Sequence, residues 1–523
     1  MAIKAKAASA AEKDDIPVES GDMQLLATLG YKQELRRHYS TTQVFAVAFS
    51  IMGLLPSIAS TLAGLGESIN LSIWKTLADS LSRVRLSWLA PSTLQGADRI
   101  AGWLAASVFI FIVGLAMADL ASAMPTAGGL YFWTHYFSAD RWKNPLSFVV
   151  GYSNTIGLLG GVCSVDYGFA TMLLSVVSLS HDGNWTASRA VVYGTYVACV
   201  VVHGLIATFF GRIMPKIQSA CIVSNVGLVL ATALALPIGK AIRGGHINAG
   251  AYVFGHLGNL TTWPQGWAFM LAWLSPIWTI GAFDSCVHMS EEATHAARAV
   301  PLGIIWSAGL CGALGFLSLA VIAAVIDVNL DSVLSTNLGQ PMAQVIAASR
   351  QSWAFSRDGA LPFSSFFRKV SKKIRYQPVR MIWGVVVSAV IVGLLCIINS
   401  AASNALFSLA VAGNDLAWMM PILCRLVWGQ DRFHPGEFYT GRFSKPIAVV
   451  AIVYLVFAII LCMFPTMGPD PTSQDMNYTV VINGALWGGA LLYYGLYARK
   501  VYKGPQTTVG SSSSVSEANI GGL

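Results

Sequence analysis

The stretch LSPIWTIGAFDSCVHMSEE, from Leu274 to Glu292, interrupts an otherwise apolar membrane segment. Pro276 removes a backbone hydrogen-bond donor, and Gly281 allows the chain to leave the helical conformation. Asp284 follows shortly after, and a carboxylate at membrane depth is costly unless it faces water, a partner or a solute. The stretch therefore predicts a broken helix that lines a solute site, with a packed pair between Asp284 and another internal polar group as the alternative.

The composition is that of a polytopic membrane protein. Of 523 residues, 55% are hydrophobic and 11% are charged, whereas roughly a quarter of the residues in soluble domains are charged. The net charge of +8 comes from short basic clusters between apolar runs, which set membrane orientation and do not indicate nucleic-acid binding. This composition predicts a lipid-embedded protein. The sequence has no CxxC pair, no P-loop and no metal-ligand motif, so we expect that it is not an enzyme and uses no metal or cofactor.

Apolar runs and charged linkers divide the chain into three parts. Residues 1–40 predict a cytoplasmic N-terminal tail, whose end at Leu29 to Arg37 predicts either a short membrane-surface helix or a solvated segment. Residues 41–500 predict a transmembrane transporter domain, and residues 501–523 predict a flexible cytoplasmic C-terminal tail. Basic residues gather in the loops assigned to the cytoplasm, which places both termini there.

Two stretches depart from a design of twelve spans. Residues 66–99 form an atypical charged insert between the first and second spans. Near 338–350 the chain is truncated, because Pro341 to Ser349 supplies only about half of the ~20 apolar residues that a membrane helix needs. The basic run that follows still requires a crossing to the cytoplasm. We therefore predict about eleven spans, with the eighth of twelve missing.

The first span is interrupted in the same way as the sixth. Its sequence FSIMGLLPSIAST, from Phe49 to Thr61, carries Gly53 and Pro56 in the middle. Helices interrupted by Gly or Pro at matching positions of two inverted five-helix repeats mark the solute site of many secondary transporters. We therefore predict an all-α fold with a five-plus-five inverted repeat and a solute between the two breaks. A simple proline kink is the alternative for the first span.

The two breaks predict a zwitterionic solute. Free N–H groups at half-helix N-termini attract a carboxylate, whereas Asp284 attracts an ammonium group. Trp278 or Phe283 either forms an aromatic wall for the amine or packs in the core. The candidate substrate-binding residues are Gly53, Pro56, Ser57, Ile58, Trp278, Gly281, Ala282, Phe283 and Asp284.

Four further acids are candidates for a gate or for ion coupling. Asp166 and Asp415 lie at membrane depth, where an acid is either a polar contact within the bundle or a proton relay. Glu291 and Glu292 end the sixth span, where they predict a cytoplasmic gate or a salt bridge. Two histidines lie in or near spans, His203 and His288, and we interpret both as packing residues.

Several stretches together resemble the fungal amino acid, GABA and choline permease family of the amino acid, polyamine and organocation transporter superfamily. These stretches are LGYKQELRR at 29–37, FSIMGLLPSIASTL at 49–62, GLAMADLASAMPTAGGLYFWTHYF at 114–137, SPIWTIGAFDSCVHMSEEA at 275–293 and ASRQSWAFSRDGALP at 348–362. The resemblance implies symport of amino acids or related amines with protons across the plasma membrane, or alternatively the vacuolar membrane. Because the family has a full eighth span, the competing hypothesis is a non-transporting protein, either a nutrient sensor or an inactive variant produced by splicing or by an error in the gene model.

Overall fold

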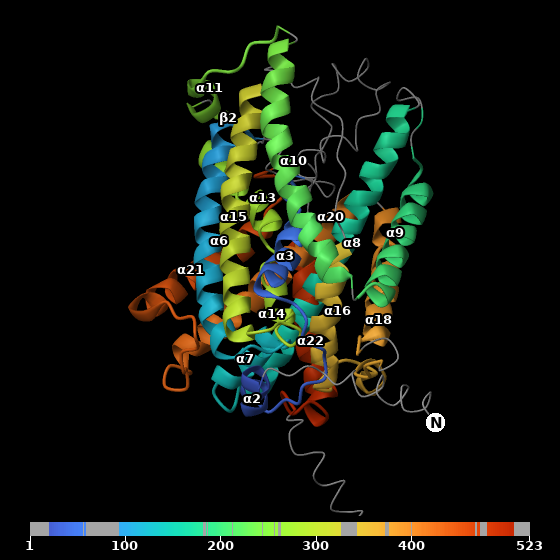
Figure 1. Cartoon of the computed structure of the whole chain (residues 1–523), viewed down its shortest axis with the longest axis vertical. Coiled ribbons are helices and arrows are strands. Elements are labelled where there is room, and N and C mark those ends of the chain that lie inside the picture. The colour runs from blue at the N-terminus through green and yellow to red at the C-terminus, as the bar shows by residue number, and fades with distance from the viewer. Residues whose placement is uncertain are drawn as a thin grey trace, which may run out of the picture.

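The chain folds into a bundle of long helices that run side by side along one axis (Figure 1). In this computed structural model, eight of the described helices are long and apolar enough to cross a membrane. They are α6 (Ala97–Ala123), α8 (Lys143–Ser180), α9 (Arg189–Phe209), α10 (Met214–Ile242), α15 (Ala296–Val325), α20 (Ser400–Val427), α21 (Ser444–Cys462) and α22 (Thr479–Leu496). The structure describes residues 20–55, 57–58, 94–180, 185, 187–211, 213–242, 244–255, 257–259, 263–325, 342–371, 376–398, 400–465, 468–470 and 478–506.

The other three predicted spans consist of shorter helices. The first span begins with α3 (Thr41–Met52), and the ninth coincides with α18 (Val379–Val392). The sixth comprises α12 (Gln265–Leu271), α13 (Leu274–Thr279) and α14 (Ser285–His288). Each predicted span therefore has a helical counterpart. The remaining helices are α2 (Ser20–Thr28), α7 (Gly129–Phe137), α11 (Gly250–Gly255), α16 (Met342–Arg357), α17 (Ser364–Phe367), α19 (Leu395–Ile398) and the 3-10 turns η4 (Gly441–Phe443) and η5 (Ala498–Lys500).

One small ribbon departs from the all-α prediction. β1 (Leu94–Gly96) and β2 (Leu257–Asn259) pair antiparallel, with Gln95 opposite Gly258. β1 leads directly into α6, so the second span begins at Ala97 and residues 97–99 of the predicted insert 66–99 belong to this helix. Residues 66–93 of the insert lie outside the described residues. The all-helical membrane fold is otherwise confirmed.

Glycines allow the central helices to approach closely. α15 packs along α6, and α20 packs along α8. A Cβ at Gly315 of α15 would lie 2.1 Å from the ring of Trp103 on α6, and one at Gly413 of α20 would lie 3.2 Å from the Cα of Gly157 on α8. Small residues at crossings are typical of membrane helices, whose association depends on close van der Waals contact. α3 packs within this bundle against both α10 and α15.

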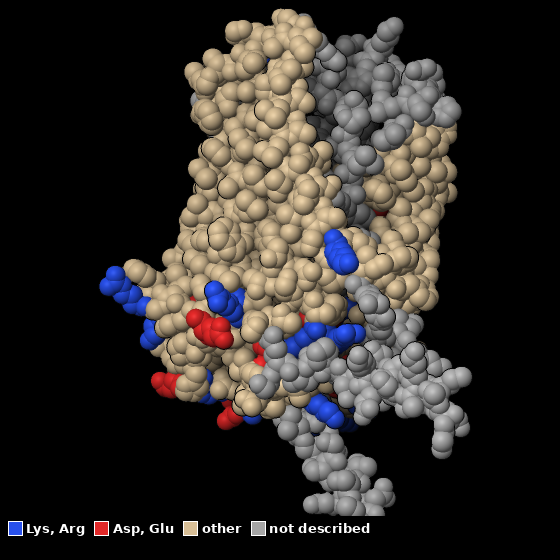
Figure 2. All heavy atoms as spheres, viewed as in Figure 1, with Lys and Arg blue, Asp and Glu red and all other residues tan. Residues whose placement is uncertain are grey.

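Charged side chains gather at one end of the bundle, whereas its long sides are largely uncharged in the view of Figure 2. This end, called the charged end below, carries α2, α7 and the last turns of α22 (Figure 1). Large apolar side chains are exposed along the helices, and Leu234 of α10 and Val453 of α21 are both 65% exposed. Long uncharged sides that expose large apolar side chains are the surface that a lipid bilayer requires.

The N-terminal segment corrects the prediction of a membrane-surface helix or solvated segment at Leu29 to Arg37. These residues have an irregular backbone that packs into the charged end. The buried Arg37 guanidinium donates to the carbonyl oxygens of Ser290 at 3.0 Å and Ala293 at 2.6 Å. These carbonyls follow the broken sixth span and need donors, which is why the segment packs inside the protein and not on the membrane surface.

The C-terminal tail begins later than the predicted boundary at residue 501. Tyr502 is buried, and its hydroxyl lies 3.0 Å from that of Ser147 on α8. The backbone N–H of Gln506 donates to Asp358 Oδ1 at 3.4 Å. The segment up to Gln506 is therefore part of the folded domain, and residues 507–523 lie outside the described residues.

The region of the predicted missing span is described only in part. α15 ends at Val325, far from the charged end, whereas α16 ends near it (Figure 1). α16 contains 16 residues and is therefore about 24 Å long, which is less than the ~30 Å hydrocarbon core of a bilayer. Residues 326–341 lie outside the described residues, so the missing eighth span stays a prediction.

Candidate functional site

The first break lies at Gly53. α3 ends at Met52, and Gly53 adopts a left-handed backbone conformation with φ 42° and ψ 62°, which glycine accommodates more readily than other residues. Helical turns resume at Leu54, and the buried Ile58 lies on the second of them. Ser57 donates its hydroxyl to the Met52 carbonyl at 2.6 Å. The first span is thus interrupted as predicted, and Pro56 lies outside the described residues.

The second break covers residues 280–284, between α13 and α14. These residues form turns, and no hydrogen bond of the described residues uses the backbone N–H of Ala282, Phe283 or Asp284. A buried donor without a partner costs about 1–3 kcal/mol. The unwound segment therefore has backbone donors that a ligand can use.

Gly281→Ala should destabilise the protein by about 1–3 kcal/mol and reduce its activity. A Cβ at this position would lie 2.7 Å from the carbonyl oxygen of Ile277, which belongs to the backbone and cannot move aside cheaply. Gly489→Ala on α22 is the matched control, because nothing lies within 4 Å of a Cβ there and alanine favours a helix. Thermal unfolding in detergent compares the two, and an equal effect of both substitutions would contradict the prediction.

Asp284 is buried beside the second break without a cationic side chain of Lys or Arg. Its Oδ2 accepts a hydrogen bond from Asn154 Nδ2 on α8 at 3.3 Å and lies 3.6 Å from His288 Nε2. Its Oδ1 has no hydrogen-bond partner among the described residues. Among those residues, Asp284 forms no ion pair with Lys or Arg. The charge of this carboxylate is therefore left for another group to neutralise.

His288 connects Asp284 to the segment between α6 and α7. Its Nδ1 lies 3.1 Å from the carbonyl oxygen of Ala127, and because a carbonyl only accepts hydrogen bonds, this nitrogen carries a proton. The other ring nitrogen, Nε2, faces the Asp284 carboxylate at 3.6 Å and has no hydrogen-bond partner among the described residues. His288 thus brings a titratable group to the site, beyond the packing role predicted for it.

A second buried acid, Asp415 on α20, lies close enough to Asp284 for the two carboxylates to repel each other. The neighbouring Asn414 accepts a hydrogen bond from Asn154 at 3.2 Å, which joins α20 to the amide that holds Asp284. Asp415 Oδ2 and the Tyr454 hydroxyl have no hydrogen-bond partner in the described part of the chain. Buried polar atoms without partners are rare, so their concentration here indicates a site for a polar ligand.

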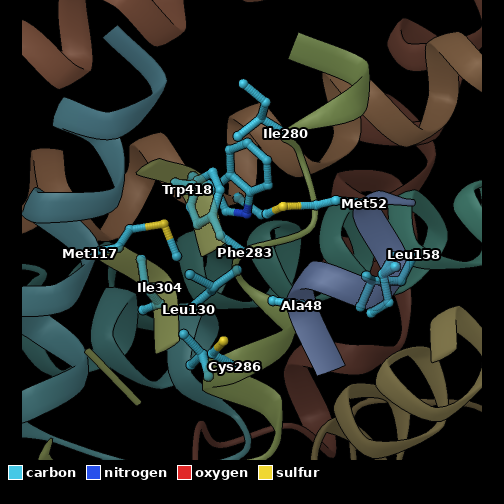
Figure 3. Packing of buried hydrophobic residues seen from close by; sticks show 14 of the residues in the cluster. Ala48, Met52, Met117, Leu130, Leu158, Ile280, Phe283, Cys286, Ile304 and Trp418 are labelled. Atoms are coloured by element: carbon cyan, nitrogen blue, oxygen red, sulfur yellow. The ribbon is translucent and has the colours of Figure 1, made fainter. Parts of the chain in front are cut away.

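Aromatic rings lie beside the unwound segment. The ring centroids of Phe283 and Trp418 are 4.6 Å apart, and Met52 at the end of α3 points toward them (Figure 3). The face of an aromatic ring attracts a cation. Trp278, the other predicted aromatic residue, is half-buried on α13. The rings of Phe283, within the second break, and Trp418 therefore form an aromatic wall at the break.

Glu291 and Glu292 form buried ion pairs with arginines of α16 near the charged end. Arg357 donates two hydrogen bonds to the Glu291 carboxylate, at 2.9 and 3.0 Å. Arg350 Nε donates to Glu292 Oε1 at 2.7 Å. All four side chains are at most 4% exposed. The salt-bridge interpretation of these two acids is confirmed, and their role as a gate stays a prediction.

Asp358 joins this cluster to both terminal segments. Tyr31 of the N-terminal segment and Tyr131 of α7 donate their hydroxyls to Asp358 Oδ2 at 3.0 and 2.8 Å, and Gln506 donates to Oδ1 from the C-terminal segment. Burial raises the pKa of Asp358 to about 6, although Arg357 and the two tyrosine hydroxyls favour its charged form. The charge of this cluster therefore changes between pH 5 and pH 7.

Lowering the pH from 7 to 5 should stabilise the packed cluster around Asp358 by about tenfold, or roughly 1 kcal/mol. The pKa of this carboxyl is raised from 3.8 to about 6, so the packed form binds a proton that an opened, hydrated form releases. The stabilisation is complete below about pH 4 and is lost as the pH rises through about 6. Hydrogen exchange of α16 at pH 5 and pH 7 measures it. Asp358→Asn should remove this pH dependence, and an unchanged dependence in that variant would contradict the prediction.

Asp166 lies apart from this site. It is about 18 Å further along α8 than Asn154, at 1.5 Å per residue. Its Oδ1 lies 2.7 Å from His203 Nδ1 on α9, and its Oδ2 has no partner in the described part of the protein. Both predicted roles, polar contact and proton relay, fit this pair. Within the described ranges, no group of three or more His, Cys, Asp or Glu side chains is placed to hold a metal ion.

The comparison with known families agrees with this architecture. A family model described as amino acid permease matches residues 39–346 and, in a second piece, residues 328–486. The chain belongs to the amino acid permease family. The two matched pieces of the permease overlap at 328–346, within the region between α15 and the end of α16.

Two permeases with similar sequences match nearly the whole length of this permease. A GABA-specific permease of Saccharomyces cerevisiae is 41% identical over 520 residues, which cover 93% of this chain and 86% of that protein. An uncharacterised amino-acid permease of Schizosaccharomyces pombe is 30% identical over 529 residues, which cover 95% of this chain and 91% of that protein. A solved structure of a manganese transporter from Eremococcus coleocola, in complex with an aromatic bis-isothiourea compound, has a TM-score of 0.47 and 13% identity, covering 92% of this chain and 97% of that one.

Sequence analysis did not single out four residues that the permease brings to the site. Asn154 and Asn414 had a detectable signal, because amide side chains are uncommon inside apolar helices and need partners there. Trp418 and Tyr454 had none, because aromatic residues are frequent both in packed cores and near membrane interfaces. Their presence near Asp284 and Asp415 depends on how α20 and α21 pack.

Proposed function

We propose that this permease imports amino acids or related amines together with protons, through a site between its broken first and sixth spans. The observation that carries the proposal is the buried Asp284 carboxylate, which has no Lys or Arg partner among the described residues. A buried charge without a counter-charge is costly, so a cationic group of the substrate is the partner that fits. The adjacent Phe283 and Trp418 rings suit an ammonium group.

In this proposal the carboxylate of a zwitterionic substrate binds backbone N–H groups. The unused N–H groups of the second break and the half-helix that begins at Leu54 both provide such donors. The relative named a GABA-specific permease makes GABA the first substrate to test, with other amino acids, choline and polyamines as alternatives. The proposed binding residues are Gly53, Pro56, Ser57, Ile58, Trp278, Gly281, Ala282, Phe283 and Asp284.

We further propose that the charged end faces the cytoplasm of a cell whose plasma membrane holds the protein, with the vacuolar membrane as the alternative. The concentration of basic residues at this end supports the orientation, which puts both termini inside. The ion pairs of Glu291 with Arg357 and Glu292 with Arg350 then close the cytoplasmic side of the site. Alternating access would break them when the site opens inward.

A non-transporting membrane protein is the competing proposal, as a nutrient sensor or as an inactive variant without an eighth span. It is supported by the length of α16, which lies between α15 and α17 in the described part of the chain and is shorter than a full membrane span. Without a full span in this region, the scaffold around the site would lack one of its supporting helices.

Uptake of radiolabelled GABA, arginine, alanine and choline by cells that express this chain tests the proposal. We expect saturable uptake of at least one of them, faster at acidic external pH and absent from cells with an empty vector. A second version, in which an eighth span is inserted between α15 and α16, separates the two proposals. Transport by the second version alone would favour the inactive variant, and transport by neither version would overturn the proposed function.

A further inference from the structure

We propose that Asp415 on α20 carries the proton that moves with each substrate molecule, while Asp284 stays ionised to bind the substrate's ammonium group. This inference rests on the proposed function and assigns the ion-coupling step within it. It follows from the different surroundings of two acids that lie close enough to repel each other.

The two acids differ in the donors that reach them. Asp284 accepts a hydrogen bond from Asn154, and a donor of this kind favours an ionised carboxylate. In contrast, no hydrogen bond or ion pair of the described residues involves the Asp415 carboxylate, which is 1% exposed and whose Oδ2 has no partner. Two acids whose environments differ in this way divide the roles of base and acid between them.

Among the described residues, the titratable groups that face Asp415 do not supply a counter-charge. They are Asp284 from the unwound segment and Tyr454 and Cys462 from α21, none of which carries a positive charge. The nearest arginine on its own helix, Arg425, is about 15 Å further along the axis and pairs with Asp119 of α6. No positive charge of these groups can therefore balance an ionised Asp415 in the closed protein, so a bound proton is what neutralises this side chain.

Counting charges gives the coupling. The ammonium group of one substrate molecule neutralises one carboxylate, and the substrate's own carboxylate binds backbone N–H groups. With Asp284 paired to the ammonium, an ionised Asp415 would remain buried without a counter-charge. The loaded site therefore closes only after Asp415 has taken a proton from the external solution, which forms an O–H bond on its carboxyl. That bond breaks when the site opens inward and water reaches the carboxyl.

The three other acids predicted as candidates for ion coupling have partners that tie them elsewhere. Glu291 and Glu292 are paired with arginines of α16. Asp166 is held by His203, about 18 Å along α8 from Asn154. Asp166 is therefore the rival acid in the experiment, because it too is buried with one oxygen unpartnered.

The experiment uses the full chain in liposomes with a pH gradient, acidic outside, and the substrate identified by uptake. With one proton per substrate, a gradient of two pH units supports up to about 100-fold accumulation. Asp415→Asn imitates the protonated acid permanently. We expect this variant to exchange external for internal substrate at a near-normal rate. The internal substrate concentration should, however, only reach about that outside, and an internal pH dye should report no proton influx.

The controls separate this inference from the proposed function. Asp140→Asn, on an exposed acid, should keep both exchange and accumulation. Asp415→Glu should keep accumulation with a shifted pH profile, which excludes misfolding as the cause of a loss. Infrared spectra recorded at a pH well above the pKa of Asp358, which is about 6, should contain the C=O band of a protonated carboxyl that disappears in Asp415→Asn and persists in Asp284→Asn.

Two results would overturn the assignment. The first is an Asp415→Asn variant that still accumulates substrate, especially if Asp166→Asn does not. The second is an infrared band that survives in Asp415→Asn. An unmodified chain that neither exchanges nor accumulates any substrate would instead reject the proposed function, and the infrared result would still report which acid holds a proton.

Discussion

Asp284→Asn should lower the initial rate of uptake by about 100-fold. The substitution keeps the size of the side chain but removes the charge that a bound ammonium group needs. Loss of one partner from a buried, hydrogen-bonded charge pair costs about 2–5 kcal/mol, and each 1.4 kcal/mol corresponds to a factor of ten. Initial rates at substrate concentrations far below saturation measure this loss.

The same substitution should leave thermal stability unchanged or raise it. Asp284 is a buried acid without a Lys or Arg partner among the described residues, and such a group destabilises a site that holds no ligand. Asp140→Asn is the matched control, because that side chain is 96% exposed beside Lys143, and its uptake should equal that of the unmodified chain. Lower stability together with lower uptake would assign Asp284 to packing, and normal uptake would remove it from the site.

Arg357→Gln should destabilise the protein by about 3–5 kcal/mol. The Glu291 carboxylate, whose side chain is 0% exposed, would lose both hydrogen bonds from Arg357, keep the one from the Ala127 N–H, and remain buried without a cationic partner. The guanidinium also lies 4.1 Å from the ring centroid of Tyr31 and 4.8 Å from that of Trp353, so its cation–π contacts would be lost as well. Thermal unfolding of the purified chain in detergent measures the change.

Combining Arg357→Gln with Glu291→Gln should restore most of this stability, because the buried Glu291 charge that lost its partner is then removed as well. Lys143→Gln is the matched control at the exposed pair with Asp140, where no measurable change is expected. An equal loss in the single and the double variant would show that Arg357 acts through its contacts with the rings of Tyr31 and Trp353 and not through its ion pair with Glu291.

The two breaks in the spans were predictable from the sequence because local backbone chemistry causes them. Gly53 has a left-handed conformation, and Gly281 leaves no room for a Cβ beside the carbonyl of Ile277. Both requirements act between neighbours in the chain, so the residue type alone indicates them. An acid in an apolar segment, such as Asp284, can also be recognised from the sequence. The free-energy cost of burying its carboxylate arises from the membrane, whichever side chain lies beside it.

The partners of Asp284 were not predictable in this way. Asn154 lies 130 residues away in sequence, and Asp415 lies on a different helix again. In a membrane helix both the lipid-facing and the protein-facing sides are apolar, so the sequence has no amphipathic pattern that would indicate which residues point inward. For the same reason Trp418 and Tyr454 could not be distinguished from ordinary apolar contacts.

Composition, hydropathy and local backbone rules thus specified the membrane class, the approximate limits of the spans and the positions of both breaks. Packing specified the charge pattern of the site. It brings Arg357 of α16 to Glu291, draws the segment from Leu29 to Arg37 into the charged end, and leaves Asp284 with an amide instead of a cation. Burial and neutralisation of charge depend on groups that meet only when distant helices pack together, which is why the sequence alone does not contain them.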